Sequence, residues 1–513
     1  MAFRLSRPLD IDPSGQTLLD VQEIAQCVRK TAGALHTAGL RSGDRFAVYK
    51  DNHFDCLLLA AAGIRIGAIP VMLSGLLPYD SMRPLLQRVE PKLLVSSRRL
   101  LASRGDDGNP LSAFAERTLS LDGGAEDALA FADLYGSADP APSPRGDDEL
   151  MMLTHTSGTT GIPKLIMYTP AKLQGQMARL ECRHLPPITF RRNDTVAMFT
   201  PYVHARAFTW IYSVLTLAPA KVLLMSDSDP EVVGPLFRQQ RPTVIEGLPI
   251  DFLQMEELAK ERGHNAFSSV RMFVGNFDAV HWSTIRTFLN ASRHRFPLWR
   301  EGYGQSETGG MGMTVITRQK ANKRRDALPG PRPVGRPMPG FVQLKVVHPE
   351  TFEPVPNGRP GLVLARTKAR CIGYYREPER WDEKATGDWW NTGDIGIKTK
   401  SGQLKLLDRE INYSPGASCL ELEDIIVDYL PARHDVALLP LLDGPPVPVV
   451  ATPDGQLDQA RWRRAVRGLP PLAEPIVIEF KDMPRTGTGK IIRAELRARH
   501  LDEARHPGTG RWI

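Results

Sequence analysis

Helix and strand signals alternate along the first third of the chain, and this order restricts the folds that the chain can adopt. Apolar residues recur at helical spacing over 19–39 and stop at Gly39, a common helix terminator. A strand is then predicted at 45–49, a second helix at 53–65 and another strand at 69–73. Such alternation is typical of the α/β fold class, in which helices cover a largely parallel sheet.

The pattern changes twice further along the chain. Residues 311–407 contain short apolar runs broken by Gly and Pro, which indicates a β-rich subdomain. After Asp408-Arg409 helices are predicted at 420–430, at 457–467 and from about 490, with strands at 435–442, 447–451 and 476–480. We therefore predict a large N-terminal domain of βα-layered sheets at 1–408, a hinge at 409–411 and a small α+β domain at 412–513.

Composition excludes several classes of protein. Of the 513 residues, 42% are hydrophobic and 24% are charged, which is ordinary for a globular protein. The longest uncharged apolar stretches, 66–79 and 207–220, are shorter than the roughly 18 residues that a membrane span needs. The N-terminus lacks the apolar core of a signal peptide, so we expect a cytoplasmic protein. The five cysteines are scattered without Cys-x-x-Cys, which favours reduced thiols over disulfides or a zinc site.

The formal net charge of +7 suits anionic ligands without indicating nucleic acid. The densest basic run is Arg318–Arg325, which we interpret as a solvated surface loop. Contact with a phosphorylated ligand is the alternative. Because no aromatic residues interleave with these charges, we predict no nucleic-acid partner.

A loop rich in glycine and hydroxyl groups lies between strands predicted at 151–154 and 165–168. Glycines let the backbone approach a ligand closely, hydroxyls add hydrogen-bond donors, and a terminal lysine adds positive charge. The loop does not match the common nucleoside-triphosphate loop, and a flexible linker is the alternative. We predict that it cradles a polyphosphate through Thr156, Ser157, Gly158, Thr159, Thr160, Gly161 and Lys164.

Four further motifs follow in order: Tyr303-Gly-Gln-Ser-Glu-Thr308, Thr392-Gly-Asp394, Asp408-Arg409 and Pro484-Arg-Thr-Gly-Thr-Gly-Lys490. Together with the loop at 156–164, they make nearly the whole chain resemble the adenylate-forming superfamily. This superfamily comprises acyl-CoA synthetases, nonribosomal-peptide adenylation domains and beetle luciferases, and the resemblance favours the acyl-CoA synthetase branch. It implies use of ATP, Mg²⁺ and CoA, and a C-terminal domain that acts as a mobile lid.

The motif at 303–308 offers a flat aromatic face and, in Glu307, a hard oxygen ligand of the kind that Mg²⁺ prefers. The resemblance implies that Tyr303 contacts the adenine, that Ser306 lies near the α-phosphate and that Glu307 binds magnesium. Taken alone, the motif also fits a surface turn. It approaches a serine-hydrolase elbow as well, but lacks the last glycine of that pattern.

An ionised carboxylate at Asp394 can accept hydrogen bonds from both hydroxyls of a ribose. The resemblance assigns Asp394 and Arg409 to the ribose, and Lys490 to catalysis of the first half-reaction. The charge of Lys490 would neutralise the repulsion between an attacking carboxylate and the α-phosphate. Without the other motifs, Asp394 would also fit a turn or a helix cap, and Lys490 a solvated lysine at a helix start.

Two further residues follow from the resemblance. His204, in Thr200-Pro-Tyr-Val-His-Ala205, resembles a histidine that CoA synthetases place near the acyl pocket; a structural histidine is the alternative. Gly416 matches a glycine past which pantetheine moves. Amino-acid-activating relatives have an Asp near the position of His204, and this chain has none, which favours an acid without an α-amino group.

Two segments depart from the superfamily pattern. Residues 274–278 read Val-Gly-Asn-Phe-Asp, where relatives usually have small residues that line the adenine and acyl pocket. Residues 408–416 are shorter than the usual hinge segment, and Ile411 stands where Asp or Lys is frequent. These changes leave the predicted fold intact and put the rate of one half-reaction in question.

The predicted reaction joins a carboxylic acid to ATP, giving acyl-AMP and pyrophosphate, and then transfers the acyl group to the thiol of CoA. An enzyme limited to one half-reaction is the first alternative. It would either thioesterify a supplied acyl-adenylate or adenylate the acid for transfer to a carrier protein. A catalytically silent acyl- or nucleotide-binding protein is an alternative of another class. The sequence does not distinguish aryl, fatty and polycyclic acids.

Overall fold

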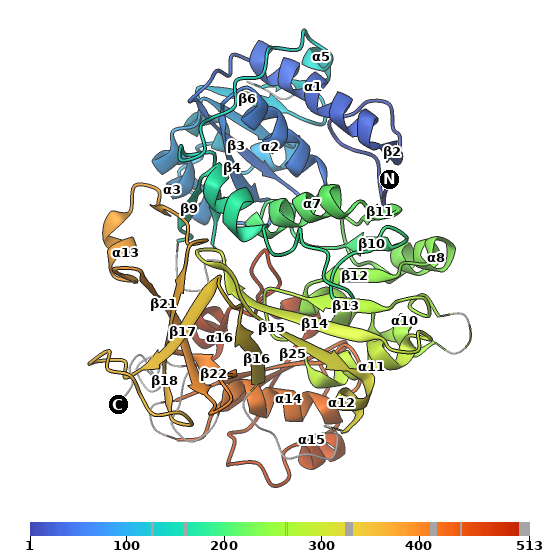
Figure 1. Ribbon diagram of the computed structural model, residues 1–513, viewed down its shortest axis with the longest axis vertical. Coiled ribbons are helices and arrows are strands. Elements are labelled where there is room, and N and C mark those ends of the chain that lie inside the picture. Colours follow the sequence, from blue (N-terminus) through green and yellow to red (C-terminus); the bar gives the residue numbers. More distant parts are fainter. Residues whose placement is uncertain are drawn as a thin grey trace. The chain divides into compact units, whose positions relative to one another are not determined.

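The computed structural model describes residues 1–124, 128–156, 162–261, 263, 265–323, 332–410, 418–441 and 444–501 (Figure 1). The chain divides into two compact units. Unit 1 comprises Met1–Asp227 and Ala369–Trp381, and unit 2 comprises Ser228–Lys368 and Asp382–Ile513. These units do not coincide with the division at 408–412 predicted from the sequence, which remains a prediction about a hinge.

The main sheet of unit 1 has eight strands in the order β19–β9–β8–β4–β3–β5–β6–β7. All pairs from β8 to β7 along this order are parallel, whereas β9 pairs antiparallel with β8 and with β19. The predicted α/β class is therefore confirmed. The strands are β3 (Arg45–Lys50), β4 (Ile69–Ser74), β5 (Leu93–Ser96), β6 (Arg117–Ser120), β7 (Leu129–Ala130), β8 (Met152–His155), β9 (Leu165–Tyr168) and β19 (Gly373–Tyr374).

The first helix, α1 (Val21–Thr37), shows how local sequence sets its ends. The Asp20 side chain accepts a hydrogen bond from the Glu23 backbone N–H at 2.8 Å, and the Glu23 side chain accepts one from the Asp20 N–H at 2.7 Å. This capping box satisfies two backbone donors that the first turn leaves unpaired. The helix ends before Gly39, whose φ is 102°, so the predicted helix at 19–39 is confirmed within two residues.

The other helices of unit 1 also follow the predicted alternation. In Figure 1, α1 and α2 lie side by side. The helices of unit 1 after α1 are α2 (Asp55–Arg65), α3 (Tyr79–Val89), α4 (Arg98–Leu101), α5 (Phe131–Leu134), α6 (Pro170–Lys172) and α7 (Ala205–Leu217), with α13 (Pro378–Asp382) at the end of the second segment. Four more strands pair in the order β10–β11–β1–β2. These are β1 (Ala2–Leu5), β2 (Leu18–Asp20), β10 (Thr195–Met198) and β11 (Lys221–Leu224).

Nine strands of unit 2 pair in the order β12–β13–β14–β15–β16–β22–β21–β18–β17, and β20 pairs with β21. The pairs β12–β13 and β13–β14 are parallel, and the pairs from β14 to β17 are antiparallel. The predicted β-rich character of 311–407 is therefore confirmed. The strands are β12 (Val244–Gly247), β13 (Met272–Gly275), β14 (Leu298–Gln305), β15 (Gly309–Thr317), β16 (Arg332–Pro337), β17 (Val342–Val347), β18 (Pro360–Thr367), β20 (Ala385–Thr386), β21 (Trp389–Lys398) and β22 (Leu404–Arg409).

The basic run at 318–325 is a helix where the structure describes it, so its interpretation as a loop was wrong. Residues Arg318–Lys323 form α12, and the Arg318 guanidinium donates to the backbone carbonyls of Leu289 at 2.9 Å and Ser292 at 2.6 Å. The arginine therefore pairs with carbonyls at the end of α11. The other helices of this part are α8 (Pro230–Gln240), α9 (Pro249–Gln254), α10 (Glu256–Lys260) and α11 (Trp282–Ala291).

The last part of unit 2, residues 418–501, has its own three-stranded sheet, and we call it the C-terminal module. Its strands run in the order β23–β24–β25, and Ile426, Val450 and Trp462 belong to a buried cluster under α14 and α15. Every predicted element is present, although the last helix begins at Arg493 and not near Lys490. The elements are α14 (Cys419–Tyr429), β23 (Asp435–Leu439), β24 (Val447–Thr452), α15 (Gln459–Ala465), β25 (Ile476–Glu479) and α16 (Arg493–His500).

Candidate active site

Three of the motif residues meet at one carboxylate in unit 2. The Tyr303 hydroxyl donates to Asp394 Oδ2 at 2.7 Å, and Arg409 Nη1 lies 3.1 Å from Asp394 Oδ1. Strand pairing explains one of these contacts, because Asp394 on β21 stands directly opposite Arg409 on β22. Tyr303 reaches Asp394 from a third strand, β14. Tyr303 lies 91 positions and Arg409 15 positions from Asp394 in the sequence, and the fold brings both side chains to this carboxylate. We call Tyr303, Asp394 and Arg409, with Gln305, the carboxylate cluster.

Gln305 is a member of the cluster to which sequence reasoning gave no role. Its side-chain amide donates to Asp394 Oδ2 at 3.1 Å and to the Thr392 carbonyl at 2.6 Å, and its amide oxygen accepts from Trp390 Nε1 at 3.1 Å. These contacts fix the orientation of the amide. In the sequence, only its position inside the motif at 303–308 could have indicated a role for Gln305.

Electrostatic interactions within the cluster shift the pKa values of Tyr303 and Arg409. Burial and the charge of Asp394 raise the pKa of Tyr303 well above its usual value, so the phenol stays neutral and donates its proton. The Asp394 carboxylate also raises the pKa of Arg409, against the opposing effect of burial. The Arg409 side chain remains 51% exposed while that of Asp394 is only 4% exposed, so a ligand can reach the guanidinium.

Ser306 and Glu307 lie in the turn between β14 and β15. Both are half-buried. Thr308, at the end of the turn, is buried and donates its backbone N–H to the Gln305 carbonyl at 3.2 Å. The charge of Glu307 is among the causes that raise the pKa of Arg409, which places this carboxylate within electrostatic reach of the cluster.

The predicted phosphate loop is described only at its ends. Ser157, Gly158, Thr159, Thr160 and Gly161 lie outside the described residues. The Thr156 N–H donates to the Lys164 carbonyl at 2.9 Å, and the Lys164 N–H donates to the Thr156 hydroxyl at 3.0 Å. The two ends are therefore closed by hydrogen bonds, and the flanking strands β8 and β9 are present as predicted. The Lys164 ammonium lies 4.8 Å from the centre of the Tyr374 ring, also in unit 1.

Lys490 closes a tight turn in the C-terminal module. The Thr486 N–H donates to the Lys490 carbonyl and the Gly489 N–H to the Thr486 carbonyl, each at 2.8 Å. Gly489 has φ +77°, and a Cβ there would lie 2.6 Å from Ile250 Cγ2 at the start of α9. The turn therefore packs against the segment that follows β12. Among the residues that the structure describes, the Lys490 ammonium makes no ion pair.

His204 has a structural contact, and Gly416 cannot be placed. The His204 Nδ1 accepts the Arg206 backbone N–H at 3.0 Å, so the imidazole caps the N-terminus of α7. This contact fits the structural alternative, and a role in catalysis stays a prediction. Gly416 and Ile411 lie outside the described residues.

Asp408 is a buried residue of β22 whose carboxyl contacts the start of the C-terminal module. Its Oδ2 accepts the Cys419 backbone N–H at 3.0 Å, and its Oδ1 accepts the Arg409 N–H at 3.2 Å. Burial raises the pKa of Asp408 to about 8. The carboxyl is therefore largely protonated at neutral pH, which the sequence did not indicate.

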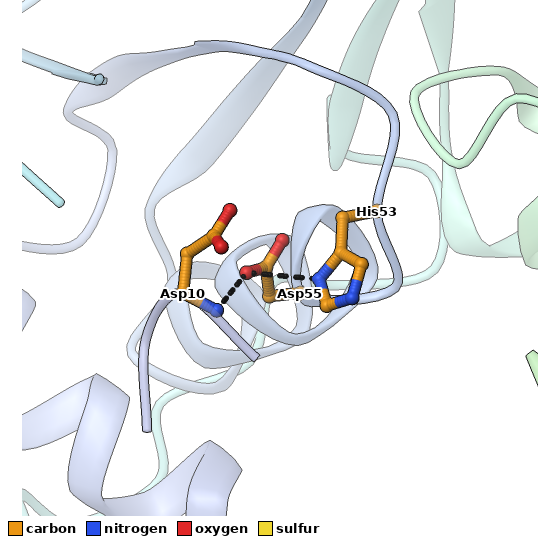
Figure 2. Close-up of side chains that lie close together, drawn as sticks. All are labelled: Asp10, His53 and Asp55. Atoms are coloured by element: carbon orange, nitrogen blue, oxygen red, sulfur yellow. Dashed lines mark hydrogen bonds and ion pairs between the residues drawn. The ribbon is translucent and has the colours of Figure 1, made fainter. Parts of the chain in front are cut away.

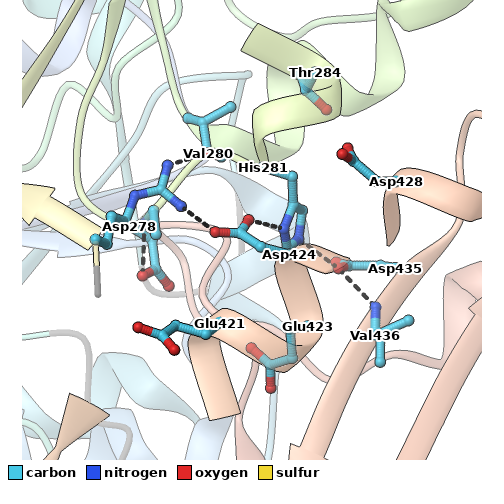
Figure 3. Close-up of polar contacts among 12 residues, drawn as sticks. Asp278, Val280, His281, Thr284, Glu421, Glu423, Asp424, Asp428, Asp435 and Val436 are labelled. Atoms are coloured by element: carbon cyan, nitrogen blue, oxygen red, sulfur yellow. Dashed lines mark hydrogen bonds and ion pairs between the residues drawn. The ribbon is translucent and has the colours of Figure 1, made fainter. Parts of the chain in front are cut away.

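Figure 3 shows a second charged group in unit 2, where His281 lies between two carboxylates of the C-terminal module. Its Nδ1 is 2.8 Å from Asp424 Oδ1 and its Nε2 is 3.5 Å from Asp435 Oδ1. Burial lowers the pKa of His281, but the hydrogen bonds to Asp424 and Asp435 outweigh burial and raise it to about 10. Arg332 extends the group by pairing with Asp424 at 3.1 Å and with Glu301 at 3.0 Å. Sequence reasoning missed this group entirely.

One cluster of carboxylate and imidazole groups has metal-like spacing, but its chemistry does not fit a metal site. Asp10, His53 and Asp55 lie close together in unit 1 (Figure 2). The ammonium of Lys50, a residue that is 2% exposed, lies 2.7 Å from Asp10 Oδ2 and contacts Asp55 Oδ1. A lysine already supplies the positive charge that a metal ion would bring, so we interpret the cluster as a buried ion network.

Comparisons with known proteins agree with the motifs. Residues 11–375 match the family described as AMP-binding enzyme. The chain is 36% identical to the 3-amino-2-hydroxy-4-methoxybenzoate diazotase of Streptomyces cremeus, over 96% of this chain and 91% of that protein. It is 26% identical to the feruloyl-CoA synthase of an Amycolatopsis species, over 94% of each chain.

Solved structures agree on the fold. ATP-bound MatB of Rhodopseudomonas palustris superposes with a TM-score of 0.75 at 22% identity, covering 98% of this chain and 95% of that one.

Among the described residues, no helix has the length and apolar character needed to cross a membrane.

Proposed function

Because this chain belongs to the AMP-binding enzyme family, we propose that it uses ATP to convert an oxyanion substrate into an adenylate, releasing pyrophosphate. The observation that carries the proposal is the carboxylate cluster. A buried carboxylate that is positioned by a phenol, an amide and an exposed arginine can hold a vicinal diol. A carboxylate has about four lone-pair sites. Tyr303 and Gln305 occupy two of them on Oδ2, so the two ribose hydroxyls would bind at Oδ1, where the exposed Arg409 would give way to them.

The family resemblance suggests the roles of the other residues. Tyr303 would contact the adenine and Ser306 the α-phosphate, while the loop from Thr156 to Lys164 would hold the β- and γ-phosphates. Glu307 offers a hard oxygen ligand of the kind that Mg²⁺ prefers, and would hold the metal ion. Bound Mg²⁺ would neutralise charge that develops on the leaving pyrophosphate.

Lys490 would act in the adenylation step. Both reactants are anions, so their repulsion dominates the barrier, and an ammonium without a protein partner among the described residues can be delivered between them. The tight turn at Thr486–Lys490 fixes the direction in which the lysine leaves the C-terminal module. In the proposed cycle this module moves about residues 409–411 between the two half-reactions, which excludes water from the adenylate.

The first candidate acceptor is the thiol of CoA. In this reaction a carboxylic acid without an α-amino group becomes acyl-AMP, the sulfur attacks the acyl carbon, and AMP leaves with the carboxyl oxygen. His204 would lie near the acyl group, and Gly416 would let pantetheine pass. A carrier-protein thiol is the alternative acceptor, as is an enzyme that performs only one of the two steps. We expect the reaction in the cytoplasm, where ATP and CoA are available.

The second candidate is diazotisation of an aromatic amine, which the 36% identity to a diazotase favours over the 26% identity to a CoA ligase. Converting an amine to a diazo group needs nitrogen at the oxidation state of nitrite. Nitrite attacks the α-phosphorus of ATP through oxygen, giving a nitrosyl–AMP anhydride and pyrophosphate. The amine nitrogen then attacks the nitroso nitrogen and AMP leaves. The resulting N-nitrosamine takes up a proton and loses water to give the diazonium.

One experiment separates these reactions. The purified chain is incubated with ATP, Mg²⁺ and a panel of benzoates with and without amino groups, alone, with CoA, or with nitrite. Pyrophosphate release and product mass are measured in every arm. A CoA thioester supports the ligase reaction, and pyrophosphate release with acid alone but no CoA product supports transfer to another acceptor. Nitrite-dependent release with an aryl diazo product supports diazotisation. Folded protein that releases no pyrophosphate in any arm overturns the proposal in favour of a silent binding protein.

A further inference from the structure

A buried histidine stands directly before the predicted phosphate loop. His155 is the last residue of β8 and is 7% exposed. Its Nδ1 lies 2.7 Å from the carbonyl oxygen of Thr156. Its Nε2 lies 3.2 Å from the backbone nitrogen of Ser74, the last residue of β4. The imidazole therefore joins the end of one strand to the residue at which the chain leaves another.

These two contacts select one form of the imidazole. The Thr156 carbonyl can only accept a hydrogen bond, so Nδ1 carries a proton and donates. The Ser74 N–H can only donate, so Nε2 carries no proton and accepts. The neutral tautomer with its proton on Nδ1 satisfies both contacts. Burial lowers the pKa of His155, against the opposing effect of the hydrogen bond to Thr156, which keeps the ring neutral at neutral pH.

Strand pairing explains why a side chain takes this place. The Gly75 N–H donates to the Lys50 carbonyl of β3 at 2.8 Å. Successive N–H groups of a strand point in opposite directions, so the Ser74 N–H points away from β3 and toward β8. The last residue pair between β4 and β8 is Met72 with Thr154, and Ser74 lies two residues beyond it. The imidazole accepts this N–H where the pairing of the two strands has ended.

The contact with His155 completes the fixation of Thr156. The Thr156 N–H donates to the Lys164 carbonyl at 2.9 Å, and the Thr156 hydroxyl accepts the Lys164 N–H at 3.0 Å. Because the imidazole holds the carbonyl, all three polar groups of Thr156 are hydrogen-bonded. A loop that binds phosphates through its backbone gains affinity when its direction is fixed before binding.

We propose that His155 is a positioning residue for the phosphates of ATP. Its neutral imidazole anchors Thr156 to the end of β4 and so sets the direction in which the phosphate loop leaves β8. The inference rests on the proposed function, because that function assigns the loop to the β- and γ-phosphates. A histidine that only stabilised unit 1 would not favour ATP over AMP. A positioning histidine favours nucleotides that carry the β- and γ-phosphates.

The test compares the dissociation constants of α,β-methylene-ATP and AMP by isothermal titration calorimetry on the full chain with Mg²⁺. The ATP analogue cannot release pyrophosphate, so binding is measured without turnover. His155→Phe keeps an aromatic ring and loses both hydrogen bonds. His155→Asn keeps a donor near the Nδ1 position, and His155→Gln keeps an acceptor near the Nε2 position. His36→Phe, at a half-buried histidine in the last turn of α1, is the matched control.

The wild type should bind α,β-methylene-ATP more tightly than AMP. His155→Phe should reduce this ratio about 10-fold, which is the effect of losing one hydrogen bond to a charged group, and should leave the affinity for AMP unchanged. His155→Asn and His155→Gln each keep one of the two contacts, so their ratios should fall between those of wild type and His155→Phe. The His36→Phe control should keep the wild-type ratio.

Melting temperatures identify the variants that fold. A wild-type ratio in folded His155→Phe, an equal loss of affinity for both nucleotides, or no preference for the ATP analogue in wild type overturns the inference. If His155→Phe does not fold, wild-type ratios in both His155→Asn and His155→Gln overturn it. Failure of the wild type to bind either nucleotide refutes the proposed function instead.

Discussion

The protonated His281 between Asp424 and Asp435 should make docking of the C-terminal module depend on pH. Its pKa rises from 6.5 to about 10 in the structure. One pKa unit corresponds to about 1.4 kcal/mol, so the full shift sets an upper bound of about 5 kcal/mol. The side chain is 21% exposed and shares its charge between two carboxylates. We therefore expect a contribution on the order of 2 kcal/mol.

The sign follows from the direction of the shift. A group whose pKa is raised on docking contributes fully below its undocked value near 6.5, and the contribution is lost as the pH rises toward 10. His281→Gln should therefore lower the opening free energy of α14, measured by hydrogen exchange, most strongly near pH 6 and hardly at all near pH 10. His184→Gln, which removes an exposed histidine of unit 1, serves as the control. An equal loss at both pH values, or an NMR titration of His281 near 6.5, would refute the reasoning.

Three other changes test separate parts of the account. Lys490→Ala should cut adenylation, measured as pyrophosphate release, by about 10²–10³, and should spare the acceptor step from supplied adenylate; equal loss in both assays would remove Lys490 from its role. Asp408→Asn should gain stability relative to wild type as the pH rises from about 4 to 8, because wild type must hold a proton on a carboxyl whose pKa is about 8. A pH-independent difference in urea unfolding would contradict this. Gly489→Ala would place a Cβ 2.6 Å from Ile250 Cγ2 at positive φ, and should destabilise the turn by about 1–3 kcal/mol. Ile250→Ala should recover part of that loss, and no recovery would mean that backbone strain alone sets the cost.

The sequence predicted well wherever the signal was local. The helix at 19–39 and the strands around the loop at 156–164 were placed within two residues, because capping residues and apolar periodicity act over a few positions. The C-terminal elements were found for the same reason. The roles of Tyr303, Asp394 and Arg409 came from residue chemistry together with resemblance. Their contacts could not be predicted, because Arg409 meets Asp394 through the pairing of β21 with β22 and Tyr303 reaches it from β14.

Contacts that depend on tertiary structure were missed. His281 and Asp424 are separated by 143 positions, and nothing near either residue indicates the other. His155 and Ser74 are 81 positions apart, and their contact depends on the pairing of β4 with β8. The interpretation of Arg318–Arg325 as a loop was wrong because it considered only the density of charges. Arg318 is the first residue of helix α12.

The central claim, that Asp394 holds the ribose of the nucleotide, has a direct test in a binding cycle. AMP and 2′,3′-dideoxy-AMP are titrated into wild type and Asp394→Asn, and the four dissociation constants define the coupling between the carboxylate and the hydroxyls. Glu350→Gln, which removes an exposed carboxylate after β17, is the control. Two hydrogen bonds to a charged group should give wild type and control about a 10²-fold preference for AMP. Asp394→Asn should bind both nucleotides alike, near the affinity of wild type for the dideoxy compound. A full preference for AMP in Asp394→Asn, or none in wild type, would contradict the account.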